Sequence, residues 1–159
     1  MAKPKKHYVD ELGDGLSLAL GRAVWAFSGI EKLMFEYMKQ LSKDDLHDLI
    51  GHQTIYKRIE IIKKLINRIK GFDIEKAEAT LSLDKIAKFI TNRNTLAHNP
   101  WLTWIDFERR EFVTEIQNVS NPTQKLNLKD VEKFTVDVGE LTQELKDKLN
   151  VLVKAFRGF

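Results

Sequence analysis

Five isoleucines that alternate four and three residues apart constrain this chain more than any other feature of its sequence. A repeat with this spacing places every member on one face of an α-helix. Lysines and arginines fall on the other side, so the pattern predicts an amphipathic helix from about His52 to Lys70. Gly71 is a natural stop, because glycine readily takes the left-handed conformation that ends a helix. The stripe consists of Ile55, Ile59, Ile62, Ile66 and Ile69.

Apolar patterns of the same kind predict a helix on either side of this one. The first runs from about Ser17 to Leu41, and Glu31 interrupts its stripe. Asp73 can cap the other helix. That helix should end within the two residues before Pro100, because proline disfavours the helical conformation at the residue that precedes it. We expect the stripe of the first helix to consist of Leu20, Val24, Phe27, Met34, Met38 and Leu41.

The period changes between Trp101 and Val119, where apolar residues alternate with polar ones on both sides of a charged turn. This pattern predicts a β-hairpin, followed by a loop over 120–127. A last helix is expected from about Asp130 to Phe156. The fold class is therefore mainly α, an up-and-down four-helix bundle with one β-hairpin inserted before the last helix. We expect one domain over 13–159, preceded by a flexible basic tail over 1–12.

Composition excludes several classes of function. The 159 residues include no cysteine, which rules out a disulfide framework, a thiolate zinc site and a cysteine nucleophile, and which fits a cytoplasmic location. No run approaches the length of a membrane span, and the basic start lacks the apolar stretch of a secretory signal. Nucleotide-binding and metalloprotease motifs are missing. Because a solvated capping loop explains the one acidic cluster, we expect no metal and no cofactor; the cluster is Asp44, Asp45, His47 and Asp48.

The net charge is only +3, but the basic residues are clustered. Six bases and one acid lie between Lys57 and Lys70, and they could attract RNA phosphates. Any solvated helix face also shows such residues, and that explanation is the simpler one. Aromatic side chains could stack on bases, although packing explains Trp101 and Trp104 more simply. The candidates for RNA contact are Lys57, Lys64 and Arg68, with Tyr56, Trp101 and Trp104 as the aromatic residues considered.

The segment RNTLAHNPW, residues 93–101, is the most informative for function. Asn94 and His98 are four residues apart, so they share one face of a helix, and the long side chain of Arg93 can reach across. A guanidinium binds phosphate through two hydrogen bonds, an imidazole exchanges a proton near neutral pH, and an amide can orient either group. Together they could cleave a phosphodiester without metal. The same residues are also ordinary at the C-terminal end of a helix, where cations are favoured.

Arg93 and His98, with four residues between them and a polar residue after the arginine, resemble the R-x4-6-H motif of the HEPN superfamily. The resemblance covers about 17–157, with the hairpin as an insertion. It implies metal-independent RNA cleavage, in which the ribose 2′-OH attacks the adjacent phosphate and leaves a 2′,3′-cyclic phosphate and a 5′-OH. By the same resemblance, His98 would move protons, Arg93 would bind the phosphate, and Asn94 would orient them.

The resemblance also implies partners. Members of the family commonly bring two copies of the motif together across a dimer interface, and some have lost catalysis and only bind RNA or proteins. We therefore expect a homodimeric endoribonuclease acting on RNA, as a toxin or defence effector that an antitoxin protein could accompany. The alternative is a non-catalytic helical module that binds RNA or protein. Glu31 would support the site if its carboxylate pairs with Arg93, and would have no part in it if the carboxylate reaches water.

Overall fold

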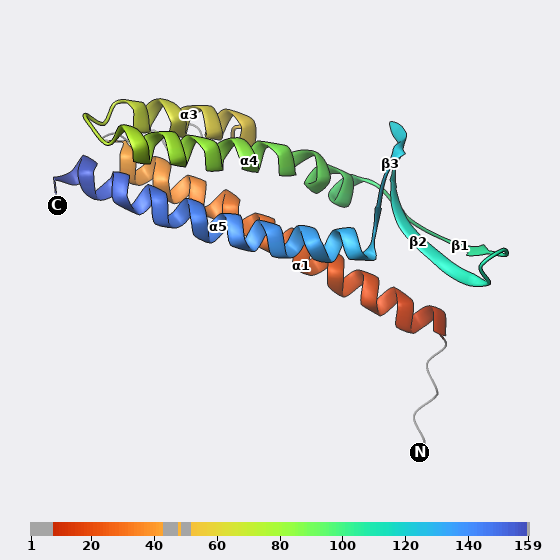
Figure 1. Cartoon of the computed structure of the whole chain (residues 1–159). Coiled ribbons are helices and arrows are strands. Elements are labelled where there is room, and N and C mark those ends of the chain that lie inside the picture. The colour runs from red at the N-terminus through yellow and green to blue at the C-terminus, as the bar shows by residue number, and fades with distance from the viewer. Residues whose placement is uncertain (1–7, 43–47, 49–51, 159) are drawn as a thin grey trace, which may run out of the picture.

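The computed structural model of the chain describes residues 8–42, 48 and 52–158. The described part is mainly helical, with a small antiparallel sheet before the last helix (Figure 1). None of the described helices combines the length and the apolar character needed to cross a membrane. In chain order the elements are α1 (Tyr8–Leu41), α3 (Ile55–Asn67), α4 (Asp73–His98), β1 (Trp101–Asp106), β2 (Glu111–Asn118), β3 (Asn121–Asn127) and α5 (Leu128–Arg157).

The helices pack as a bundle, but they do not have the up-and-down order predicted from the sequence. In such an order the first and last helices run in opposite directions, whereas α1 and α5 run in the same direction (Figure 1). Phe27 stacks on Phe134 with ring centroids 6.2 Å apart. Further along both helices, the hydroxyl of Tyr37 donates to the carbonyl oxygen of Lys146 at 3.1 Å.

Helix α4 runs antiparallel to α5. Ser82, in the first half of α4, donates to Glu144, in the second half of α5, at 2.9 Å. Phe89 lies further along α4 and packs edge-on against Phe134, near the start of α5. Helix α3 runs in the same direction as α1 and α5 (Figure 1).

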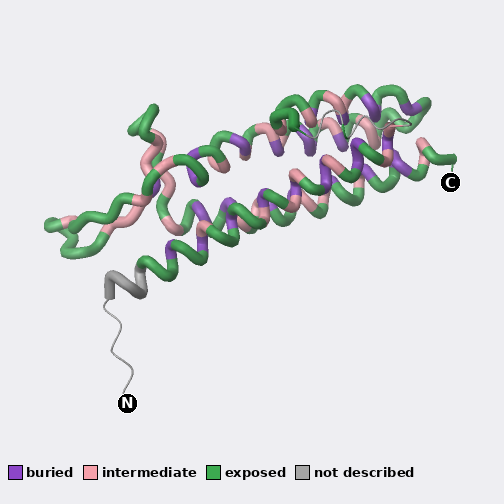
Figure 2. Tube along the Cα trace, turned by 180° about the vertical axis from the view of Figure 1, so that it is seen from behind, coloured by how far each residue is buried: buried purple, intermediate pink, exposed green. Residues whose placement is uncertain are grey.

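The core lies along the helix interfaces, as the buried residues in Figure 2 show. The isoleucine stripe is confirmed, with Ile55 half-buried and the other four members buried. Helix α5 also buries one apolar face, with Phe156 half-buried near its end. The buried members of that face are Val131, Phe134, Val138, Leu141, Leu145, Leu149 and Leu152.

Helix α1 differs from the prediction in its start and in its buried face. It begins at Tyr8, so residues 8–12 of the expected basic tail are helical, and 1–7 lie outside the described residues. Val24 is 46% exposed. Because α1 packs against three other helices, its buried face is wider than one stripe and centres elsewhere. That face is made of Leu16, Ala19, Ala23, Phe27, Ile30, Leu33, Met34, Tyr37, Met38 and Leu41.

The predicted start of α4 is correct, but its cap is not. Helix α3 ends at Asn67 with Arg68 as its cap, so Gly71 does not end it as predicted. Gly71 does take a left-handed conformation, and Phe72 follows it with the same handedness at φ 58°. Phe72 therefore occupies the capping position without a side-chain hydrogen bond. Asp73 lies in the first turn instead and pairs with Lys76 at 2.8 Å. Ile74 and Leu81 are apolar residues of α4 that face solvent.

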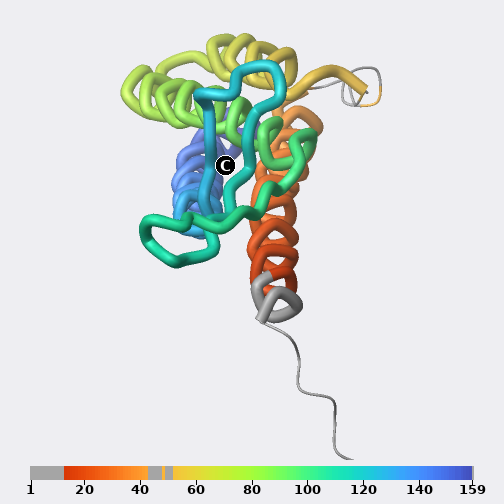
Figure 3. The backbone as a smooth tube through the Cα atoms, turned by 90° about the vertical axis from the view of Figure 1, so that its right-hand side faces the viewer, coloured from red at the N-terminus to blue at the C-terminus, as the bar shows by residue number. Residues whose placement is uncertain are grey.

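Strand β3 occupies the segment predicted to be a loop, so the insertion is a three-stranded sheet in the order β1-β2-β3 and not a hairpin. Its sequence is almost entirely polar and carries Pro122, so no apolar alternation marks it. Leu126 is the member of β3 that packs against the core, where it pairs with the buried Ile116 of β2. Seen end-on, the sheet lies across one end of the helices (Figure 3).

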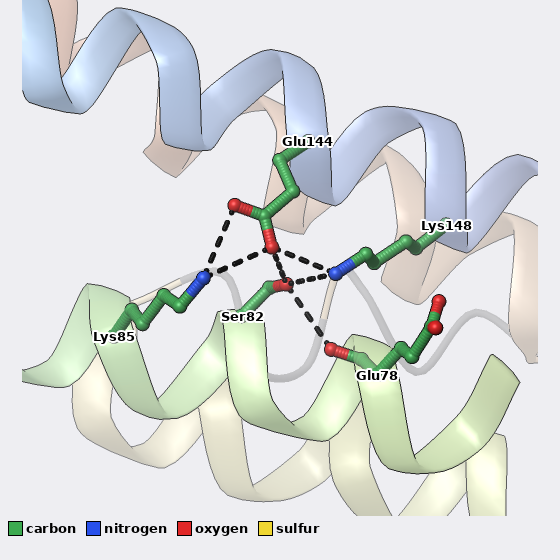
Figure 4. Close-up of polar contacts among 5 residues, drawn as sticks. All are labelled: Glu78, Ser82, Lys85, Glu144 and Lys148. Carbon is green, nitrogen blue, oxygen red and sulfur yellow. Dashed lines mark hydrogen bonds and ion pairs between the residues drawn. The ribbon is translucent and has the colours of Figure 1, made fainter. Parts of the chain in front are cut away.

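A polar cluster connects α4 and α5 beside the apolar core (Figure 4). The carboxylate of Glu144 accepts hydrogen bonds from Lys148 at 2.7 Å, from Ser82 at 2.9 Å and from Lys85 at 3.1 Å. Ser82 is fully buried, and the carbonyl oxygen of Glu78, 3.1 Å from its hydroxyl oxygen, is a second acceptor that shares the one hydroxyl proton with Glu144. The hydrogen bond from Lys148 is the main reason why the pKa of Glu144 falls to about 2.

Candidate functional site

The last turns of α4 carry the motif residues, close to α1, the start of α3 and the sheet. The helix ends at His98, as predicted. Asn94 and His98 are both exposed and lie one turn apart, while Arg93 is half-buried on the side that faces α1. Arg93 therefore lies beside α1, whereas His98 lies beside the turn between β2 and β3.

Arg93 is held by three groups of its own chain. Its Nη2 lies 3.6 Å from Oε1 of Glu31, and its Nη1 donates to Oδ1 of Asn94 at 3.3 Å. The guanidinium also lies over the ring of Phe27, 6.0 Å from the centroid, where a cation is attracted to the aromatic face. The pairing of Glu31 with Arg93 considered from the sequence is thus present, although each side chain keeps about a third of its surface in water, at 35% and 36%.

A cleft of about 330 Å³ opens beside this arginine, between α1, α3 and α4. Arg93 and Asn94 line it from α4, Glu31 from α1, and Tyr56 and Arg58 from α3. Two arginines and one glutamate therefore line the cleft. Arg58 is not among the site residues predicted from the sequence. The run of basic residues included it, but which base faces α4 depends on how α3 packs.

A second hollow, of about 340 Å³, surrounds His98. Asn94, His98 and Asn99 line it from α4, and the turn between β2 and β3 lines it with Val119 and Ser120. Asn99 joins the two sides, because its Oδ1 accepts from the backbone N–H of Val119 at 2.8 Å and its Nδ2 donates to the carbonyl oxygen of Thr95 at 3.0 Å. The sheet thus forms one wall of the hollow. This wall could not be predicted once β3 was taken for a loop.

Arg93 lines the first hollow and His98 the second, while Asn94 lines both. A ligand that occupied both hollows of one chain would lie along Asn94, whose Oδ1 accepts a hydrogen bond from Arg93.

The basic residues predicted to contact RNA lie on one exposed face of α3. Lys57, Lys64 and Arg68 are seven and four residues apart, so they project in nearly the same direction and are exposed. Lys63 projects elsewhere and pairs with Asp84 of α4. These three residues form what we call the basic stripe of α3.

The three aromatic residues considered for RNA contact have different surroundings in the structure. Tyr56 is 49% exposed and lines the Arg93 cleft. Trp101 packs against the core, which agrees with the simpler explanation. Trp104 is 39% exposed on the sheet and has the ammonium of Lys125 5.5 Å from its ring centroid. Of the three, Tyr56 shares a cleft with Arg93 and Asn94.

Within the described part of the chain, no group of three or more histidine and acidic side chains could hold a metal ion. Asp44, Asp45 and His47 of the acidic segment lie outside the described residues, so the expectation for that segment stays a prediction.

No family model, curated protein or solved structure matches the chain. The resemblance to the HEPN superfamily therefore depends on the motif at residues 93–98 and on its place at the end of a helix.

Proposed function

We propose that this chain is a HEPN-type endoribonuclease that cleaves RNA without metal, with Arg93, Asn94 and His98 as its site. One observation supports this most. The three residues lie at one accessible helix end, where Asn94 contacts Arg93 and borders the hollow of His98. A cation, an amide and an imidazole are therefore available to one extended ligand.

The proposed reaction uses a nucleophile that belongs to the substrate. The imidazole of His98 accepts the proton of a ribose 2′-OH, whose oxygen forms a bond to the adjacent phosphorus. The bond from phosphorus to the 5′-oxygen breaks, and this oxygen receives the proton back from His98. The products are a 2′,3′-cyclic phosphate and a 5′-OH. A positioned acid–base group typically contributes about 10²–10⁴-fold to such a step.

In this proposal, Arg93 stabilises the negative charge that develops on the phosphate. Negative charge grows on the phosphate oxygens as the new bond forms, and a guanidinium can bind two of them at once. Glu31 and Asn94 hold the guanidinium from two sides, so little of its orientation has to be fixed when the substrate arrives. Glu31 is thus a positioning residue.

We also propose a homodimer, which the resemblance to the family implies and with which two separate hollows are compatible. Because Arg93 and His98 of one chain line different cavities, a second copy that brings its own motif nearby would place one chain's arginine opposite its partner's histidine. The roles of a cytoplasmic toxin or defence effector, and of an antitoxin protein as partner, come from the resemblance to the family.

The second candidate is a non-catalytic module that binds RNA or protein, and one observation favours it. Arg93 already interacts with Glu31 and Phe27 of its own chain, which is also what a structural arginine would do. In that case the hollows would bind a ligand, and His98 would transfer no proton.

Incubation of RNA with the purified protein in excess EDTA decides between the two candidates. We expect wild type to cleave, and His98→Ala to lose about 10²–10⁴-fold in rate. His52→Ala is the matched control, because His52 is an exposed histidine outside the motif, and it should cleave like wild type. Wild type that binds RNA but cleaves none would favour the module.

A further inference from the structure

Helix α3 brings a second cation into the cleft of Arg93. Arg58 lies in the first turns of α3, and its Nε donates to the carbonyl oxygen of Gln53 at 3.0 Å. This hydrogen bond holds the base of the guanidinium against the chain that precedes the helix. The same cleft is lined by Arg93 of α4, so two guanidinium groups from different helices border one cavity.

Two guanidinium groups at one cleft favour an anionic ligand, because each can bind two phosphate oxygens at once. Among the described residues that line the cleft, Glu31 carries a carboxylate, which lies 3.6 Å from Arg93. The volume of about 330 Å³ is near the lower end of the range of about 300–1,000 Å³ that small-ligand sites occupy. A single nucleotide unit suits this size better than a folded partner does.

Tyr56 adds an aromatic ring to the same cleft. Its side chain is 49% exposed, so part of the ring surface is open to a ligand. Stacking on an aromatic side chain contributes about 1–3 kcal/mol per base and does not depend on which base is present. An arginine and a tyrosine two residues apart thus offer a contact for a phosphate and a contact for a base.

The surroundings of the cleft indicate how a longer ligand would continue. Lys57 lies between Tyr56 and Arg58 in sequence and begins the basic stripe of α3, which extends to Arg68 on the exposed face of that helix. A polyanion bound in the cleft could therefore follow α3 away from the motif, with cations along its path.

We propose that Tyr56 and Arg58 form a nucleotide subsite for single-stranded RNA next to the reacting phosphate. Arg58 binds the neighbouring phosphate, and the ring of Tyr56 stacks on the base attached to it. This inference rests on the proposed function for the choice of RNA as ligand, but it concerns binding and not the chemical step.

Binding of a fluorescent, single-stranded 2′-O-methyl RNA tests the subsite, because this probe lacks the nucleophile and cannot be cleaved by the proposed route. Affinity is measured by anisotropy at several salt concentrations. Each phosphate contact on a single strand contributes about 0.7 to the slope of log K against log salt. Arg58→Gln should therefore weaken binding and lower this slope by about 0.7. Tyr56→Ala should weaken binding about fivefold or more with the slope unchanged.

Three further variants separate the subsite from general effects. Tyr56→Phe keeps the ring and should bind nearly as wild type does, and Arg58→Lys should keep the salt slope. Lys154→Gln removes an exposed cation near the end of α5, at the end of the bundle away from the sheet (Figure 1), and should change affinity less than twofold. Circular dichroism of every variant checks that the helices are intact.

The outcomes judge the subsite separately from the proposed function. If wild type binds the probe and the two variants lose affinity as described, the subsite holds, whether or not wild type cleaves ordinary RNA. If folded Arg58→Gln and Tyr56→Ala bind within twofold of wild type, the subsite is wrong, even where ordinary RNA is cleaved. Wild type that does not bind the probe would also overturn it.

Discussion

The guanidinium of Arg93 is in contact with three groups of its own chain before any ligand is present. Glu31 and Asn94 each approach one of its terminal nitrogens, and Phe27 lies under its face. Such a side chain has lost much of its rotational freedom in the folded state, so a phosphate that binds it does not have to order it. This arrangement suits an electrostatic role in catalysis better than a flexible surface arginine would.

Replacement of Arg93 by lysine tests whether the shape of this group matters as well as its charge. An ammonium keeps the charge but cannot bind two phosphate oxygens in the geometry of a guanidinium. We expect Arg93→Lys to cleave RNA at least about tenfold more slowly than wild type, since a hydrogen bond to a charged group is worth about 1.5–3 kcal/mol. Initial rates measure the effect, and Lys154→Gln again serves as the distant control. A variant as fast as wild type would show that charge alone is sufficient.

The pairing of α4 with α5 depends on pH through Glu144. Its pKa is about 2 in the folded protein, below the ordinary value of 4.5. A carboxyl group whose folded pKa is lowered contributes stability that is fully present above its ordinary pKa and is lost as the pH falls toward the folded value. We therefore expect Glu144→Gln to lower the free energy of unfolding at neutral pH, and the difference from wild type to shrink as the pH falls from 4.5 to 2.

Urea unfolding across this pH range measures the contribution. Glu140→Gln is the matched control, because Glu140 is an exposed acid on the same helix, and it should follow wild type at every pH. A constant difference between Glu144→Gln and wild type over the whole range would contradict the assignment of the lowered pKa to the contacts with Lys148, Ser82 and Lys85.

The core face of α3 is tested by two isoleucines with opposite environments. Ile62 is fully buried, whereas Ile74, at the start of α4, is 74% exposed. Ile62→Ala should lower the free energy of unfolding by about 2–5 kcal/mol. Ile74→Ala should change it by less than about 0.5 kcal/mol. Equal effects in urea titrations would mean that the isoleucine stripe does not face the core.

Some elements could be predicted because each buries one regular stripe. The face of α5 and the isoleucines of α3 are of this kind, and Pro100 marks the end of α4 within a residue. The start of α1 and its wide buried face could not be read from one stripe, because three neighbouring helices share that face. Strand β3 has no apolar alternation, since polar side chains take part in its pairing with β2, as where Lys125 lies 2.7 Å from Glu115.

The site was predicted only where it depends on local spacing. Helical geometry alone placed Asn94 and His98 on one face, and the interruption of the α1 stripe pointed to Glu31. The contribution of Arg58 depends on the direction of α3, and the wall beside His98 depends on the turn between β2 and β3. Both features depend on packing between segments far apart in the chain. The apolar periodicity of a single segment cannot predict such packing.

At the scale of the whole molecule, the proposed homodimer predicts how the activity of mixed variants should behave. If the site is completed across a dimer, Arg93→Ala and His98→Ala should each be inactive, but a mixture should regain activity. A mixed dimer pairs the intact arginine of one chain with the intact histidine of its partner. Random mixing should restore up to about a quarter of the wild-type rate, because half of the dimers are mixed and each has one intact site of two.

Light scattering and mixing experiments together check this prediction. A second preparation that carries both substitutions in one chain is the control, and when mixed with either single variant it should restore nothing. A protein that stays monomeric at high concentration, or a mixture that stays inactive although mixed dimers form, would contradict a site shared between two chains.

The most direct test of the central claim uses a DNA oligonucleotide with a single ribose, incubated with the protein in EDTA and analysed by mass spectrometry. Because the proposed nucleophile is the 2′-OH of the substrate, we predict cleavage only on the 3′ side of that ribose. The fragments should carry a 2′,3′-cyclic phosphate and a 5′-OH, and His98→Ala should produce almost none of them. Cleavage at deoxyribose positions, fragments with a 5′-phosphate, or equal cleavage by His98→Ala would contradict the account.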